Sequence, residues 1–253
     1  MASKKARRLI QLGLHPVLLG RNGDDLKRPC LSGWQTAVYS PIDVSRWPSR
    51  HNIGIRCGRQ RDGRSLLVFD FDEEADRIFP AWFSQAARLV AQPPIVVSSG
   101  RGYHVYFFTE EAYPSCTLAG KYGRASSSVC GRMRLFKFIE TLGEGRQVVT
   151  AGSHHPSGRR YVFDSQATYT NIPHLTAAAY HHLLVLARRF DQRPTRARRH
   201  GATPPAHFSG ALRGVDNCLT FARRFIGTVE QLEGNGDIRF LGHGGLLVTA
   251  NGR

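Results

Sequence analysis

The sequence predicts an α+β fold whose sheet is mostly antiparallel. Three observations lead to this fold class. Short runs of β-branched and aromatic residues, typical of strands, crowd the middle of the chain. One helical pattern separates the first two runs, and a second helical pattern follows the last run. The expected strands are residues 65–72, 95–98, 103–108, 135–141, 147–150 and 160–164.

The expected helices are recognised by apolar residues that recur at helical spacing. An N-terminal helix directs Leu9 and Leu12 toward the core, and residues 17–19 follow it inward. Between this helix and residue 60, recurring Pro, Gly and Trp predict irregular chain. The apolar stripes of the two later helices are Phe79, Phe83, Ala86 and Val90, with Pro80 in the first turn, and Ala179, Leu183, Leu186 and Phe190.

The composition changes after Phe190. Residues 191–207 are rich in Arg and Pro, which is typical of a linker. Residues 208–253 then hold one amphipathic helical pattern and a stretch that resembles a hairpin. We therefore expect a main domain over 1–190, a linker over 191–207, and a small helical and hairpin region that begins a following module.

The charge balance is basic and uneven. Lys and Arg number 35 against 19 Asp and Glu, which gives a formal net charge of +16. This surplus favours a polyanionic partner, although a merely soluble basic surface has the same composition. Carboxylates packed together repel unless a cation neutralises them, so an acidic cluster in such a chain predicts a metal ion. Six of the acids lie within fifteen residues: Asp62, Asp70, Asp72, Glu73, Glu74 and Asp76.

The cysteines and the N-terminus favour a cytoplasmic protein. Five cysteines are scattered without a CxxC pair, so neither a disulfide framework nor a zinc ribbon is indicated. Cys116 and Cys130 with His154 or His155 could ligate zinc, but buried thiols are the simpler account. Polar residues and a proline interrupt the apolar stretch that a signal peptide needs, and no run approaches the roughly eighteen apolar residues of a membrane span.

Asp70 and Asp72 lie two residues apart at the end of an apolar run, LLVFDFD. Residues i and i+2 of a strand face the same side, so both carboxylates are expected on one face. Phosphoryl-transfer sites that use two metal ions hold them with such paired carboxylates. A phosphatase of the haloacid-dehalogenase type and a nucleotide-sugar transferase also use this pair. The phosphatase would place a small residue and Thr after it, where this chain has Glu73 and Glu74.

The segment SSGRGYHVYFF favours a nucleotide phosphate as ligand. Gly100 and Gly102 form a turn whose backbone N–H groups can approach phosphate oxygens, and Arg101 adds positive charge. His104 then begins a strand opposite the carboxylate pair. A core histidine at the end of a strand is the alternative interpretation.

A third acid and a later polar loop extend the candidate site. Glu140 ends the strand over 135–141 and could complete a metal-binding trio with Asp70 and Asp72. The following loop, GEGRQVVTAGSHHPSGRRYVF, contains Ser153 and His155 among small residues. An exposed polar loop outside any site would have the same composition.

These motifs, in this order, resemble the primase-polymerase branch of the archaeo-eukaryotic primase superfamily. The family's strand ending in hhhDhD corresponds to VFDFD, its small-x-His to Gly102-Tyr103-His104, and its later strand ending in an acid to FIE at Glu140. KRPCLSGW and NIGIRCG look like the segments that precede the first motif. VVTAGSHHPSGRRYVF looks like the family's PPSxHxxGxxY segment, with Ala151-Gly152 in place of two prolines. The resemblance covers residues 7–190.

The resemblance implies a fold, an activity and a set of roles. The fold would be an RRM-like catalytic subdomain packed on a smaller α/β subdomain, with a small C-terminal helical appendage. The activity would be template-directed nucleotidyl transfer on single-stranded DNA with dNTP or NTP, in the replication of a plasmid, phage or mobile element. A helicase module in the same or another chain would be a further partner. The metal ligands for two Mg²⁺ or Mn²⁺ ions would be Asp70, Asp72 and Glu140, and the nucleotide ligands would be Arg101, Gly102, His104, Ser153 and His155.

Two other functions stay open, and each predicts a different binding behaviour. A replication-initiator domain that kept the fold without catalysis would bind nucleotide or DNA without turnover, and it would have no use for paired carboxylates facing a polyanion. A metal-dependent nuclease would need no triphosphate pocket. In any of these functions, arginines beyond the main domain are expected to contact the DNA backbone, namely Arg193, Arg196, Arg198 and Arg199.

Overall fold

The computed structural model describes residues 2–124, 133–165, 167–194, 238–241 and 245–248. The chain divides into two compact units, Met1–Arg196 and Ala197–Arg253. Within the second unit, β11 (Ile238–Leu241) pairs with β12 (Gly245–Val248) in an antiparallel hairpin, as the sequence predicts. The helical pattern expected before this hairpin lies outside the described residues.

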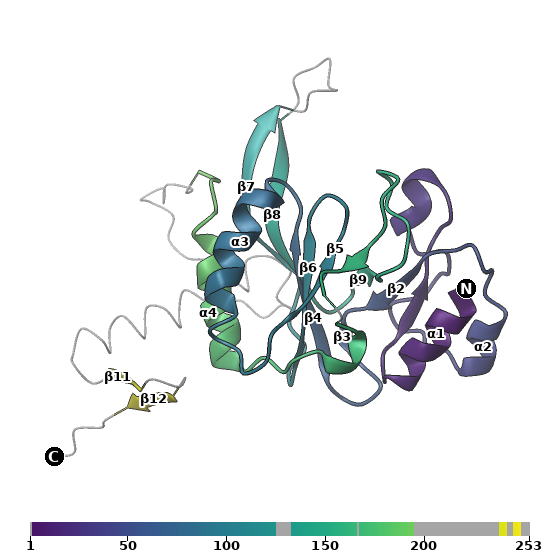
Figure 1. The fold of residues 1–253 in the computed structure, drawn as a ribbon, viewed down its shortest axis with the longest axis horizontal. Coiled ribbons are helices and arrows are strands. Elements are labelled where there is room, and N and C mark those ends of the chain that lie inside the picture. Colours follow the sequence, from purple (N-terminus) through teal and green to yellow (C-terminus); the bar gives the residue numbers. More distant parts are fainter. Residues whose placement is uncertain (1, 125–132, 166, 195–237, 242–244, 249–253) are drawn as a thin grey trace, which may run out of the picture. The chain divides into compact units, whose positions relative to one another are not determined.

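The first unit is built around a seven-stranded sheet (Figure 1). Its strands follow the order β10-β5-β6-β4-β8-β7, and β3 pairs with β4 beside this path. Every pairing between these strands is antiparallel, which confirms the predicted α+β class. The strand bounds are β3 Gly58–Arg59, β4 Ser65–Phe71, β5 Ile95–Ser98, β6 Tyr103–Thr109, β7 Cys116–Arg124, β8 Met133–Leu142 and β10 Val162–Phe163.

One face of this sheet is covered by two helices, α3 (Ala75–Ala86) and α4 (Ala177–Arg188) (Figure 1). Trp82 of α3 is fully buried between the sheet and α4. Its ring centroid lies 5.1 Å from that of Phe69 and 5.0 Å from that of Phe71, and its indole N–H donates to the Leu183 carbonyl at 3.3 Å. Aromatic contacts of this kind add about 0.5–1.5 kcal/mol beyond area burial.

Both helices differ from their predicted stripes. Helix α3 begins at Ala75, directly after Glu74 in the left-handed region (φ 55°), so Pro80 lies inside the helix and not in its first turn. The helix ends before Val90. The buried residues of α4 are Tyr180, His181, Leu183, Leu184 and Ala187, so of the four predicted positions only Leu183 is buried. This rotation lets Tyr180 stack on Tyr113, with ring centroids 3.9 Å apart.

A smaller three-stranded sheet, ordered β1-β2-β9, belongs to the N-terminal part of the unit. Its strands are β1 (Pro16–Leu18), β2 (Ile53–Arg56) and β9 (Gln147–Val149). The predicted N-terminal helix forms as α1 (Ala2–Gln11), and the short helices α2 (Pro41–Ser45) and η1 (Gly23–Lys27) lie in the following segment. Strands β1 and β2 fall in the stretch that was expected to be irregular. Both strands are short, with three and four residues, and Pro16 begins the first while Gly54 interrupts the second, so neither shows a clear strand pattern in the sequence.

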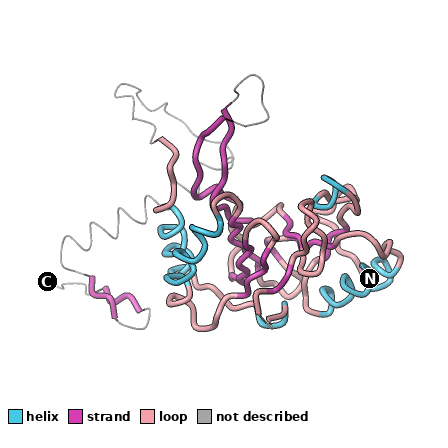
Figure 2. The backbone as a smooth tube through the Cα atoms, turned by 45° about the horizontal axis from the view of Figure 1, so that its top comes forward, coloured by secondary structure: helices cyan, strands magenta, loops and turns pink. Residues whose placement is uncertain are grey.

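The two sheets share one hydrophobic core. It combines Leu66, Val68 and Tyr106 of the large sheet with Ile55 and Val148 of the small one. Figure 2 shows the strands lying between α3 and α4 on one side and the N-terminal helices on the other. Asp70 follows Leu66 and Val68 at intervals of two, so it continues this same face at the end of β4. The hydrophobic core therefore reaches along β4 as far as the predicted metal ligand Asp70.

No helix in the described part of the chain combines the length and the apolar character needed to cross a membrane.

Candidate active site

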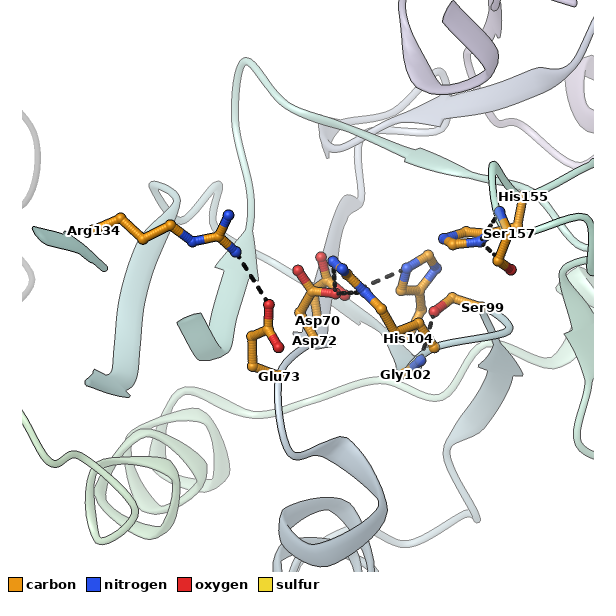
Figure 3. A network of polar contacts seen from close by, with 10 residues as sticks. Asp70, Asp72, Glu73, Ser99, Gly102, His104, Arg134, His155 and Ser157 are labelled. Carbon is orange, nitrogen blue, oxygen red and sulfur yellow. Dashed lines mark hydrogen bonds and ion pairs between the residues drawn. The ribbon is translucent and has the colours of Figure 1, made fainter. Parts of the chain in front are cut away.

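Asp70 lies between His104 and Glu140 on three neighbouring strands. In the antiparallel register, Asp70 of β4 is the direct partner of His104 on β6 and of Glu140 on β8. Residues directly opposite in such pairs project from the same face. His104 Nε2 lies 3.4 Å from Asp70 Oδ1 (Figure 3). The structure thus brings three residues that are distant in sequence onto one sheet face.

Asp72 extends this group just beyond the end of β4. Its backbone N–H donates to the Phe138 carbonyl at 3.2 Å, which ties it to β8. Its carboxylate oxygen Oδ1 accepts from Arg101 Nε at 2.9 Å and from Arg101 Nη2 at 2.6 Å. The predicted nucleotide ligand Arg101 is therefore paired with a predicted metal ligand.

The turn at Ser99–Gly102 places Arg101 over Asp72. The Gly102 N–H donates to Ser99 Oγ at 2.9 Å, and the Ser99 N–H donates to the Gly102 carbonyl at 2.8 Å (Figure 3). Gly100 has φ +80°, which favours glycine. A Cβ at Gly102 would overlap the carbonyl oxygen of Phe71, so this position needs glycine for a steric reason. Gly100 is therefore favoured by its backbone conformation, and Gly102 is required for the close approach of the turn to β4.

Glu140 is also paired with a basic side chain. Lys137 Nζ lies 2.6 Å from Glu140 Oε2, and both side chains are only partly exposed. Within the described residues, no three His, Cys, Asp or Glu side chains are gathered closely enough to hold a metal ion as they stand. Asp72 and Glu140 are each engaged by a cationic side chain in this arrangement.

Burial and the neighbouring carboxylates change the acidity of Asp70. Burial raises the pKa of Asp70 to about 8, and the neighbouring Glu140 and Asp72 add to the rise. Lys27 and Lys137 oppose it. An ionised Asp70 at this position needs a nearby positive charge.

His104 is held as a neutral imidazole. Burial lowers the pKa of His104 to about 3, with smaller contributions from Lys27 and His155. Its Nδ1 atom is buried and makes no hydrogen bond. A neutral histidine with one unsatisfied ring nitrogen can donate or accept a hydrogen bond to a ligand without a change of charge.

Tyr161 links His104 to the later loop. Its ring centroid lies 5.5 Å from that of His104 and 5.6 Å from that of His155. The Nδ1 atom of His155 accepts the Ser157 N–H at 3.1 Å, and its Nε2 atom is buried without a hydrogen-bond partner. Sequence reasoning did not single out Tyr161 as a site residue, although it ends the GxxY pattern of the loop.

Ser153 has a different environment from the other predicted nucleotide ligands. It is buried, and its Oγ lies 3.2 Å from Thr150 Oγ1 and 3.3 Å from the Ile53 carbonyl. These contacts anchor the start of the loop to β2. Arg159, further along the loop, donates from Nη1 to the Gly100 carbonyl at 3.3 Å, which ties the loop to the glycine turn.

Arg193 lies against β7. Its guanidinium pairs with Asp191, with Nε 2.8 Å from Oδ1, and Nη2 donates to the carbonyls of Thr117 and Leu118 at 3.3 Å. These contacts fasten the start of the predicted linker to the sheet. Arg196, Arg198 and Arg199 lie outside the described residues.

The fold and the site together define an α+β protein with clustered carboxylates and a neutral histidine on the inner strands β4, β6 and β8, beside the glycine turn that precedes β6. A family model described as "Bifunctional DNA primase/polymerase, N-terminal" matches residues 6–178, which include all the strands and carboxylates of the site described above. The match covers more than half of the chain, so the chain belongs to this family, and the resemblance seen in the sequence is confirmed. No curated protein matches the chain.

Proposed function

We propose that this chain is a DNA primase-polymerase that joins nucleotides on a single-stranded DNA template by a two-metal mechanism. The observation that carries the proposal is the register Glu140–Asp70–His104 across β8, β4 and β6, with Asp72 beside it. Family membership supports the class of activity. The replication of a plasmid, phage or mobile element, with a helicase module as partner, is the proposed setting.

The carboxylates fit the chemistry of Mg²⁺ or Mn²⁺. These ions prefer oxygen ligands, and Asp70, Asp72 and Glu140 supply carboxylates alone. Burial, together with the neighbouring Glu140 and Asp72, raises the pKa of Asp70, so a cation beside its carboxylate would be favourable. Metal ions bound there would neutralise charge on the reacting phosphates. Arg101 and Lys137 would have to release Asp72 and Glu140 first.

The residues around the carboxylates would position the incoming nucleotide. Arg101, released from Asp72, would pair with triphosphate oxygens. Gly102 would act by shaping the turn, since its N–H donates to Ser99 Oγ. His104 and His155 each have one buried ring nitrogen without a partner, which a phosphate oxygen or a hydroxyl would satisfy. Ser153 would act through the loop, since its hydroxyl is engaged with β2.

The proposed reaction is an in-line displacement. The 3′-oxygen of the growing strand attacks the α-phosphorus of the incoming nucleotide, the bond to the β-phosphate breaks, and pyrophosphate leaves. Positioning and charge neutralisation supply most of the catalysis in phosphoryl transfer. The paired carboxylates argue against a purely DNA-binding initiator, because they would repel the template phosphates unless cations sit between them.

Nucleotide incorporation tests the proposal. The protein is incubated with single-stranded DNA, labelled nucleotides and Mg²⁺ or Mn²⁺, with and without an annealed primer. We expect metal-dependent incorporation by the wild type and its loss in Asp70→Asn and Glu140→Gln. Glu110→Gln, which changes an exposed acid away from the site, is the matched control and should retain activity. Near-normal synthesis by Asp70→Asn would refute the two-metal assignment.

A further inference from the structure

An open groove of about 340 Å³ lies between the two helices that cover the large sheet. The end of α3 and the turn after it form one side of the groove, and the second half of α4 forms the other. Its aliphatic lining consists of Leu89, Val185 and Leu186. Its cationic lining consists of Arg88 and Arg189. The groove therefore combines apolar surface with positive charge.

The apolar part of the groove comes from a second stripe on α4. Residues 182, 185, 186 and 189 recur at the i, i+3, i+4, i+7 spacing of one helix face. Val185 and Leu186 of this stripe are only half-buried, unlike the residues of α4 that face the sheet. Leu186 was predicted to belong to the core, yet it remains at the surface beside Leu89, which is 36% exposed. Aliphatic side chains gathered at one surface position favour a binding partner.

The positive charge of the groove is not neutralised by neighbouring acids. No Asp or Glu is among the residues that line it. Within the described part of the chain, Arg88 and Arg189 form no salt bridge, whereas other exposed arginines do. Arg77 and Arg134, for example, each pair with a glutamate. An acidic ligand would supply the missing negative charge.

We propose that the groove between α3 and α4 docks a short segment of a partner protein that combines Asp or Glu with large apolar side chains. The apolar side chains would be buried against Leu89, Val185 and Leu186, and the carboxylates would pair with the two arginines. This is the usual arrangement of a protein interface, with an apolar centre and a polar rim. The inference does not depend on the proposed function.

The composition of the groove disfavours three other occupants. Nucleic-acid surfaces commonly stack bases on aromatic rings, and no Phe, Tyr or Trp lines this groove. The second unit, Ala197–Arg253, carries seven Arg against four Asp or Glu, so its charge has the same sign as the groove. A second copy of the chain has a formal net charge of +16. The segment of another, acidic protein has the complementary charge.

The groove lies on the side of the sheet away from the carboxylates. Phe69 and Phe71 of β4 contact Trp82 of α3, and Asp70 between them faces the opposite side of the sheet. Figure 1 shows α3 and α4 together on this covered side. A partner docked over the two helices would leave the candidate active site open. We therefore expect docking to bring the protein to its partner without altering its chemistry.

The test compares the wild type with Arg88→Glu/Arg189→Glu, which reverses the charge of the groove. Both arginines are exposed, so the fold should survive, and thermal denaturation checks this. Arg7→Glu/Arg46→Glu reverses the same charge at two exposed arginines outside the groove and is the matched control. Leu89→Gln is a second variant that keeps both arginines and removes an apolar contact. It tests the groove even if the charge-reversed variant does not fold.

Random peptides displayed on phage are selected on the wild type after those that bind the charge-reversed variant are removed. A labelled synthetic copy of an enriched peptide is then titrated against each protein and followed by fluorescence anisotropy. We expect enriched peptides to combine Asp or Glu with large apolar residues. Their affinity should fall roughly tenfold or more in Arg88→Glu/Arg189→Glu, where like charges would face each other, and about threefold to tenfold in Leu89→Gln. The control should bind as the wild type does.

Three results would overturn the inference. The first is the absence of enriched peptides, or enrichment of peptides without acidic residues. The second is equal peptide affinity in the charge-reversed variant and its control. The third is a different occupant: a loss of single-stranded DNA binding confined to the charge-reversed variant would assign the groove to nucleic acid, and a loss of self-association, measured by sedimentation, would assign it to a second copy of the chain.

Discussion

Lys137 contacts Glu140 although the two residues are three positions apart on one strand, with Nζ 2.6 Å from Oε2. In a regular strand, residues at i and i+3 face opposite sides of the sheet. Here Ile139 pairs with Ala119 and Lys137 pairs with Gly120, so β8 has one residue more than β7 at this point. This β-bulge turns Lys137 toward the carboxylates.

Lys137→Gln should increase the affinity for the metal ion, because it removes the ammonium group that is paired with the Glu140 carboxylate. We expect a gain of about two- to fivefold, the range for a partly exposed ion pair. Titration with Mn²⁺ followed by electron paramagnetic resonance measures this affinity. Arg134→Gln, which opens the neighbouring ion pair with Glu73, is the control and should leave it unchanged. An unchanged or weaker affinity in Lys137→Gln would contradict competition between Lys137 and the metal ion.

Gly102→Ala should destabilise the protein and abolish the geometry of the turn, because a Cβ there would overlap the Phe71 carbonyl. We expect a decrease of about 2–4 kcal/mol in the free energy of unfolding, as for other severe steric changes. Urea denaturation measures it. Gly145→Ala is the matched control: its φ of +76° is unfavourable for alanine, but open space surrounds it, so the decrease should be about 1–2 kcal/mol. Equal decreases in both variants would contradict the steric explanation.

Local patterns allowed much of the fold to be predicted from the sequence. The six expected strands form with small changes of boundary, because alternation and β-branched residues act within each segment. Strand β7 was not predicted, since Gly120 and Gly123 weaken its pattern and pairing with β8 decides its conformation. The predicted face of α4 was also wrong, because the stacking of Tyr180 on Tyr113 is a tertiary contact.

The candidate site was also predicted only in part, because some of its features depend on contacts between distant segments. Alternation along each strand places Asp70, His104 and Glu140 on a common face, but their side-by-side register depends on pairings between distant segments. The contact of Lys137 depends on a bulge, and that of Tyr161 on how the loop folds back. The sequence pattern predicts neither the bulge nor the path of the loop. Ser153 matched a motif by residue type, while its burial against β2 is visible only in three dimensions.

Lowering the pH should destabilise the protein through His15. Burial and the neighbouring Arg56 and Arg61 lower the pKa of His15 to about 4, below the usual 6.5. Between these two values the unfolded chain binds the proton more readily, so stability falls as the pH falls from about 6.5 toward 4. His15→Gln should reduce this effect by about 1–2 kcal/mol, measured by urea denaturation at several pH values. His174→Gln, at an exposed position, should leave the pH dependence unchanged. If the free energy of unfolding depended on pH equally in His15→Gln and in the wild type, other titratable groups would be responsible for the loss of stability.

The arginines after α4 should differ in what they do. Arg196→Gln/Arg198→Gln/Arg199→Gln should weaken single-stranded DNA binding and reduce its salt dependence by about 0.7 for each phosphate that is no longer neutralised. Arg193→Gln should instead lower stability, because its guanidinium is engaged with Asp191 and β7. Fluorescence anisotropy at several salt concentrations and thermal denaturation separate the two effects. Unchanged DNA affinity and salt slope in the triple variant would mean that this stretch only connects the two units.

His104→Ala should weaken binding of the incoming nucleotide more than binding of the template. The imidazole is buried beside Asp70, and removing its unpartnered Nδ1 atom would remove a proposed hydrogen bond to the nucleotide. We expect dNTP affinity to fall roughly tenfold, as when a hydrogen bond to a charged group is removed. His104→Asn keeps a donor and an acceptor and should recover part of this affinity. Titration with a dNTP and with single-stranded DNA, each followed by fluorescence, measures the two affinities. If template affinity fell while dNTP affinity held, His104 would have to be assigned to the template strand.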